Sequence, residues 1–101
     1  MIERNSRRIE VFVDQPLLRR IRDVAAEAGV VEYTILPTLG GQGERGRWHD
    51  DQVTGGAGSK VILLTYVSEE IAVKFLELLQ PLMEEYGLFV ASSNSEITYE
   101  E

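Results

Sequence analysis

Residues 38–51 read TLGGQGERGRWHDD, and the interpretation of this stretch decides the fold. It contains Gly41-x-Gly43-x-x-Gly46, which is the spacing of a dinucleotide-binding fingerprint. Such a fingerprint needs a helix directly after the glycines, because the helix N-terminus binds the pyrophosphate. The residues that follow, RWHDDQVTGGAGS, contain three more glycines and no apolar helical stripe. The stretch is therefore interpreted as a loop between two strands.

The flanking segments support that interpretation. Residues 31–37, VEYTILP, predict a strand that ends or lies at a sheet edge, because Pro37 cannot donate a ladder hydrogen bond. Residues 60–67, KVILLTYV, are apolar enough for a central strand. Compact domains rarely keep a structureless loop of about 20 residues unless it is functional. The loop is thus the first place to look for a site.

Two helices and two further strands are predicted on either side of this unit. Residues 8–14, RIEVFVD, predict the first strand. A helix then begins near Asp14 or Gln15, carries Pro16 in its first turn and ends at Gly29.

The second helix begins at Ser68 and ends at Gly87, and Pro81 should kink or divide it. Residues 88–92 predict a short fourth strand, and residues 93–101 a polar C-terminal tail. The order β-α-β, loop, β-α-β predicts one α+β domain over residues 1–101 with a ferredoxin-like βαββαβ fold. Its four-stranded antiparallel sheet would carry both helices on one face.

Two helices cannot cover both faces of such a sheet. Residues such as Thr34, Leu36, Val61 and Leu63 cannot all be buried by the helices. A large apolar sheet face is usually covered by a partner subunit, so a homo-oligomer is expected.

Composition excludes several classes of function. The net charge of -7 disfavours nucleic acid and anionic membranes as partners. The absence of cysteine removes disulfides, thiol catalysis and cysteine zinc sites. No window approaches the roughly 20 apolar residues of a membrane span, and the N-terminus has no apolar signal segment. A cytoplasmic protein is expected.

The chemistry of the loop allows two interpretations. Gly40, Gly41 and Gly43 could present backbone N–H groups as an anion-binding nest, and the loop region supplies three cations. These cations are Arg45, Arg47 and Lys60. The alternative is a mobile hairpin tip whose glycines only provide flexibility. Spacing alone favours neither interpretation.

The remaining loop residues give weaker signals. His49, Asp50 and Asp51 are better explained as a solvated tip than as a metal or acid–base cluster, since adjacent side chains in an extended loop point apart. Trp48 either contacts a ligand or partner, or folds back onto the domain. A single histidine provides no positioned base, so no catalytic residue and no metal site are predicted.

The sequence resembles the PII signal-transduction family. The resemblance begins at Arg8-Ile9-Glu10, continues through AEAGVVEYTILPTLGG, and resumes at Lys60-Val61-Ile62 and VSEE. It covers roughly two-thirds of the chain and is closest to the divergent PII-like proteins linked to carboxysomes and bicarbonate transport. The resemblance implies a homotrimer that binds adenine nucleotides in clefts between subunits. The loop of about residues 40–59 would be its T-loop, which contacts target proteins.

The resemblance also implies roles for individual residues. Gly40 and Gly41, with Gly43 in the same cluster, would line the nucleotide, and Phe12 and Thr34 would lie near the base. Arg45 or Lys60 would reach a phosphate, with Arg47 as a further candidate.

Departures from the family pattern narrow the expected ligand. The Gly-Asp-Gly-Lys type of loop before the fourth strand is replaced by MEEYGLFV, and the basic C-terminal segment by SEITYEE. The T-loop tyrosine that is uridylylated in some members is missing. With fewer cations, ADP or AMP is favoured over ATP, and bicarbonate is a candidate second ligand. No tightly bound cofactor is expected, and the partner would be a membrane transporter or a carbon-metabolism protein.

Two other classes stay open on sequence alone. Small dimeric ferredoxin-like enzymes include cofactor-free oxygenases and isomerases, which would need His49 or a tyrosine in a pocket. Trimeric ion-tolerance proteins share the architecture and would bind metal, for which this chain has few soft ligands.

Overall fold

The computed structural model describes residues 1–43, 46–48 and 59–100. The elements are β1 (Ile2–Asp14), the 3-10 turn η1 (Gln15–Leu17), α1 (Leu18–Ala28), β2 (Thr34–Pro37), β3 (Gly41–Gly43), β4 (Gly46–Trp48), β5 (Lys60–Val67), α2 (Glu69–Tyr86) and β6 (Phe89–Tyr99).

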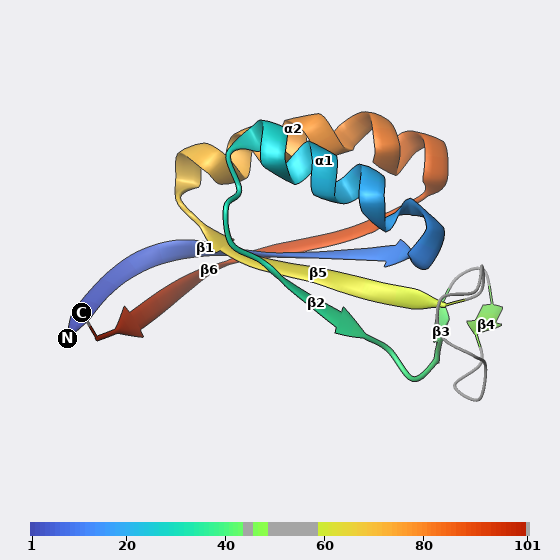
Figure 1. Ribbon diagram of the computed structural model, residues 1–101, viewed down its shortest axis with the longest axis horizontal. Helices are drawn as coiled ribbons and strands as arrows, with labels where there is room; N and C mark the ends of the chain where they lie inside the picture. Colours follow the sequence, from blue (N-terminus) through green and yellow to red (C-terminus); the bar gives the residue numbers. More distant parts are fainter. Residues whose placement is uncertain (44–45, 49–58, 101) are drawn as a thin grey trace.

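The main sheet has four antiparallel strands in the order β2-β5-β1-β6. Figure 1 shows α1 and α2 lying side by side over one face of this sheet. The ferredoxin-like fold is thus confirmed, with β5 as an inner strand and Pro37 on the edge strand β2.

Local sequence signals explain where the helices begin and end. Gly29 and Gly87 follow the two helices with φ of 96° and 68°, in the left-handed region that glycine adopts without strain. The side chain of Ser68 accepts a hydrogen bond from the Ile71 N–H at 3.3 Å, which satisfies one free donor of α2. Pro16 lies in η1, so α1 begins slightly later than predicted.

Of the two effects predicted for Pro81, a kink or a division of the second helix, the division does not occur. α2 is a single helix of 18 residues with Pro81 inside it. Proline removes one intrahelical hydrogen bond, but Leu79 and Leu82 are buried on either side of it. Packing of this apolar face holds the helix together across the interruption.

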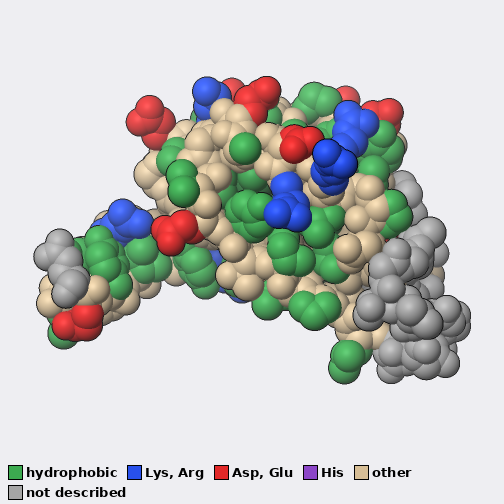
Figure 2. Space-filling view, in the orientation of Figure 1, with side chains coloured by type: hydrophobic (Ala, Val, Ile, Leu, Met, Phe, Trp, Pro, Cys, Tyr) green, Lys and Arg blue, Asp and Glu red, His purple; other side chains and the backbone are tan. Residues whose placement is uncertain are grey.

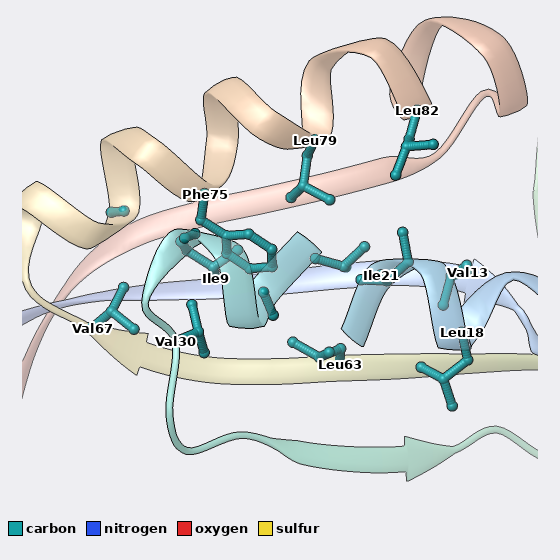
Figure 3. Close-up of a cluster of buried hydrophobic side chains, with 14 of the residues drawn as sticks. Ile9, Val13, Leu18, Ile21, Val30, Leu63, Val67, Phe75, Leu79 and Leu82 are labelled. Carbon is teal, nitrogen blue, oxygen red and sulfur yellow. The ribbon is translucent and has the colours of Figure 1, made fainter. Parts of the chain in front are cut away.

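The core lies between the helices and the sheet. Figure 3 shows Ile9, Val13 and Leu63 pointing from the sheet towards Ile21 of α1 and Phe75 of α2. Phe75, Leu63, Leu79 and Ile9 are fully buried, and they form the centre of the cluster.

Among the described residues, no element covers the sheet face opposite the helices (Figure 1). As predicted, the helices do not bury all four of the residues named from sequence: Thr34 and Leu36 are exposed on this face, whereas Val61 and Leu63 are buried. Those two residues alternate with Ile62 along β5 and therefore point into the core under the helices. Register, rather than hydrophobicity, decides which face each β5 residue takes.

β6 is much longer than predicted. It continues through the predicted polar tail to Tyr99 and pairs with β1 from Phe12↔Phe89 to Ile2↔Tyr99. In Figure 1 this pair of strands extends beyond the helical layer and brings the two termini together. Sequence patterning misses the stretch because its residues are mostly polar and lack strand alternation, whereas its pairing comes from backbone hydrogen bonds.

The loop after β2 contains local structure. β3 and β4 form a two-stranded antiparallel sheet with Gly41 opposite Trp48 and Gly43 opposite Gly46. Gly46 has a φ of 105°, which requires glycine-like freedom. The expectation of an irregular loop is therefore corrected for these residues.

Candidate functional site

The two ends of the loop are tied together at the sheet. The Thr38 hydroxyl donates to the backbone carbonyl of Lys60 at 2.8 Å, and the Gln15 N–H donates to the carbonyl of Ser59 at 2.9 Å. Residues that leave β2, return into β5 and follow β1 thus meet at one point. The base of the loop is a fixed frame formed by three segments.

Lys60 carries the positive charge of this frame. Its Nζ lies 2.7 Å from Oδ1 of Asp14, and the two residues are opposite each other on β5 and β1. Asp14 is the N-cap residue of η1, which agrees with its predicted place at a helix start, but its side chain makes no cap hydrogen bond there. The ion pair holds the ammonium group at the base of the loop.

Phe12 lies two residues before Asp14 on the same open face of β1. Its ring packs edge-to-face on Phe89 of β6, with a centroid distance of 5.3 Å and an interplanar angle of 76°. Its strand neighbour on the other side is Ile62. This row provides an apolar surface next to the charged pair.

Thr34 lies farther from the loop base. It is exposed at the start of β2, opposite Leu64, which is in turn opposite Glu10. Thr34 and Phe12 share the open face of the sheet, but they are separated by β5 and by one row of residues. The structure brings Phe12 and Lys60 together more closely than either of them with Thr34.

The glycines do not form a nest, which was one of the two interpretations that spacing left open. Gly41–Gly43 is extended as β3 and pairs with β4, whereas a nest needs alternating helical backbone conformations. Gly40 directly precedes this strand and follows Leu39, which is 82% exposed. The glycines leave room for close approach of a ligand to the backbone.

Several predicted residues cannot be placed. Arg45, His49, Asp50 and Asp51 lie outside the described residues. β4 includes the backbone of Arg47 and Trp48, and their side chains are also outside the description.

Sequence reasoning missed Asp14 and Thr38 as parts of this frame. Both are common residues at strand ends and turns, so composition gave no signal. Their role depends on the pairing register of β1 with β5 and of β2 with β5. The alignment of Asp14 with Lys60 across two predicted strands could have suggested the ion pair only if that register had been known.

A polar network lies farther along the open face. Arg8 pairs with Glu10 at 2.9 Å and donates from Nε to the Tyr66 hydroxyl at 3.3 Å. The hydrogen bond to Glu10 has the largest effect and the one to Tyr66 the next, and both raise the pKa of the Arg8 guanidinium. The face therefore combines exposed apolar side chains with an internally neutralised charge.

Two surface hollows lie largely away from the loop base. One is beside α1 and Tyr33 and reaches the loop base only at Gln15, and the other is at the foot of the β1–β6 extension near Arg7 and Glu69. Within the described ranges, no group of three acidic, histidine or cysteine side chains could hold a metal ion. Nor does this part of the chain include a helix that is both long and apolar enough to cross a membrane.

Comparison with known families gives the assignment. A sequence model described as "Nitrogen regulatory protein P-II" matches residues 6–98. The chain belongs to the PII family. A search of curated proteins gave no match.

Solved PII-like structures share the fold. The chain superposes with a TM-score of 0.84 on CPII from Thiomonas intermedia K12 bound to ADP, AMP and bicarbonate, at 22% identity over 95% of this chain and 91% of that chain. A putative PII-like signaling protein from Thermus thermophilus gives a TM-score of 0.81, with 23% identity over 96% and 93% of the two chains. At these identities the likeness establishes the fold.

Family membership decides between the open function classes. PII proteins are regulators rather than enzymes, which supports the prediction of a non-enzymatic regulatory protein. The small dimeric enzyme that sequence alone left open is not supported. PII membership of residues 6–98 also favours a signalling role over ion tolerance.

Proposed function

We propose that this PII-like protein binds ADP or AMP at the base of its T-loop, in clefts between the subunits of a homotrimer, and thereby controls a partner protein in the cytoplasm. The observation that carries the proposal is the frame at the loop base, where Lys60 lies beside the apolar surface of Phe12. A cation and an apolar surface suit the phosphates and the base of a nucleotide. Gly40, Gly41, Gly43 and Thr34, with the cations Arg45 and Arg47, would complete the site.

Assembly is supported by the uncovered face of the sheet. Leu36, Tyr66 and Phe89 are 38%, 41% and 64% exposed, although they lie on strands of the main sheet. Burial of this face between subunits would remove apolar area from water. It would also place the loop base of one subunit close to a neighbour, which is where a nucleotide cleft between subunits would form.

Bicarbonate is proposed as a second ligand, and an inorganic-carbon transporter or another carbon-metabolism protein as the partner. Support comes from CPII, whose solved structures contain ADP, AMP and bicarbonate together and ADP with bicarbonate. A ligand at the loop base would favour one arrangement of the T-loop, and that arrangement would change affinity for the partner.

The proposal is tested by charge removal at the loop base. Lys60→Ala and Arg45→Ala should each weaken ADP binding, measured by calorimetry, by about tenfold, which is the cost of losing one charge-assisted hydrogen bond. The double variant should lose about a hundredfold. The matched control is Lys74→Ala on the exposed surface of α2, which should leave ADP affinity unchanged. Unchanged affinity in the double variant would refute this site.

A further inference from the structure

Three arginines are exposed on α1 of this acidic chain. Arg19, Arg20 and Arg22 lie on one helix, and Figure 2 shows Lys and Arg side chains gathered over it. Elsewhere in the described chain, Arg7, Arg8 and Lys60 each form an ion pair with a carboxylate. Within the described residues the three arginines of α1 have no carboxylate partner, so their charge is available to another molecule.

Two of these arginines line a hollow. Arg19 and Arg22 border a solvent-open pocket of about 580 Å³, together with Gln15, Asp23 and Tyr33. This volume lies in the range that holds small ligands. Arg20, by contrast, turns to α2, where it donates to the Tyr86 hydroxyl at 3.2 Å with its guanidinium 5.8 Å from the ring centre.

Arg22 is held in place before any ligand arrives. Its Nε donates to the Tyr33 hydroxyl at 2.9 Å, and its guanidinium carbon lies 5.9 Å from the Tyr33 ring centre. Tyr33 is itself packed against the core. The contact uses one of the five donors of the guanidinium and leaves the Nη groups for an acceptor. An arginine fixed in this way loses less side-chain entropy on binding.

We infer that the pocket between α1 and Tyr33 binds a small oxyanion, a phosphate or a carboxylate. The pocket adjoins the loop base at Gln15, but its cations are Arg19 and Arg22 and not Lys60. Arg22 supplies pre-positioned donors, Arg19 supplies a second cation, and Gln15 adds a polar side chain. Asp23 is the only carboxylate among the described lining residues, so it opposes the anion and leaves a net charge of +1 from two arginines and one aspartate. The planar guanidinium matches the geometry of carboxylate and phosphate oxygens.

The test uses pyrophosphate as the phosphate probe and citrate as the carboxylate probe. Each is titrated into the full-length, ¹⁵N-labelled protein, and the arginine side-chain signals are followed by NMR. At least one probe should give saturable shifts of the Arg19 and Arg22 signals. The probe that binds more tightly identifies the class, phosphate or carboxylate.

Four variants decide whether the pocket is responsible. Arg19→Gln and Arg22→Gln should each lower the affinity for the tighter-binding probe by about tenfold, as expected for the loss of one charge-assisted hydrogen bond. Asp23→Asn should raise this affinity severalfold, because it removes a charge that repels the anion. Arg20→Gln makes the same change of charge on the same helix but lies outside the pocket. Probe affinity of this variant should stay within about twofold, because Arg20 turns to Tyr86 and gives no donor to the pocket.

Several outcomes would overturn the inference. They are the absence of saturable shifts with either probe, an equal loss in Arg20→Gln, and weaker binding in Asp23→Asn. All four side chains are exposed, so the variants should fold, and thermal unfolding checks this directly. Loss of nucleotide binding at Lys60 would leave these results unchanged, so the two sites fail independently.

Discussion

Lys60 is the residue on which the proposed site depends most. It already has a carboxylate partner in Asp14 at 2.7 Å, so a bound phosphate must share the ammonium group or displace the aspartate. Both side chains are partly exposed, and a pair of this kind stabilises the fold by only about 0–1 kcal/mol. The pair therefore matters more for ligand binding than for stability.

The first prediction follows from this competition. Asp14→Asn should raise ADP affinity severalfold, because it removes the charge that competes with phosphate for Lys60. Calorimetric titration of ADP measures the change, with Glu27→Gln on the exposed surface of α1 as a control of equal charge change. Weaker ADP binding in Asp14→Asn would show that Lys60 needs the aspartate in order to act, contrary to the account.

The second prediction concerns the core. Phe75 is fully buried between α2 and the sheet, so Phe75→Ala should lower the free energy of unfolding by about 3–5 kcal/mol. Urea unfolding measures the loss. Val31→Ala is the control, because Val31 is 88% exposed and its change should be within about 0.5 kcal/mol. If Phe75→Ala lowered the free energy of unfolding by less than about 0.5 kcal/mol, as expected for the control, the described packing would be contradicted.

At the scale of the elements, the start of α2 gives the third prediction. Ser68→Ala removes the side chain that accepts from the Ile71 N–H and should cost about 1 kcal/mol of stability. Ser68→Asp keeps an acceptor at this position and should retain most of the stability. Thermal and urea unfolding compare the two variants, and equal losses would mean that the cap does not contribute.

The elements with strong local signals were predictable from sequence. The strand at β5, the helix ends at Gly29 and Gly87, and the edge position of Pro37 all follow from hydrophobicity and backbone preference. The length of β6 was not predictable, because residues such as Asn94 and Glu96 are paired by backbone bonds that carry no side-chain signal. Cross-strand contacts add only local support, such as Arg4 at 5.7 Å from the Tyr99 ring centre.

The candidate site was predictable to a smaller extent. Lys60 and the glycines were identified from the chemistry of the loop and Phe12 through a family resemblance, and the structure places Lys60 and Phe12 at one end of the sheet. The partner of Lys60 and the ties between the loop ends depend on strand register, which one sequence does not specify when several apolar registers are possible. The extended backbone at Gly41–Gly43 depends on pairing with β4 in the same way.

At the scale of the whole molecule, the open sheet face gives the fourth prediction. We expect a trimer in solution, and Phe89→Glu or Leu36→Glu should shift it towards monomer by placing a charge on the face that assembly would bury. Val73→Glu is the control, because Val73 is 48% exposed on α2, in the helical layer. Sedimentation equilibrium measures the mass. A wild-type monomer, or dissociation caused only by Val73→Glu, would contradict assembly through the sheet.

The proposed nucleotide site also belongs to this scale, because a cleft between subunits exists only in the assembly. A single chain provides Lys60 and Phe12 on an open surface, and a neighbouring chain would enclose them. Nucleotide binding and assembly should therefore be linked, so that ADP raises the stability of the trimer by mass action.

The most direct measurement is calorimetric titration of the full-length wild-type protein with ADP and with AMP, each with and without bicarbonate. We expect saturable binding of ADP or AMP at one site per chain, with higher affinity when bicarbonate is present. Absence of binding by both nucleotides, with and without bicarbonate, would contradict the central claim that this PII protein senses adenine nucleotides at the base of its T-loop.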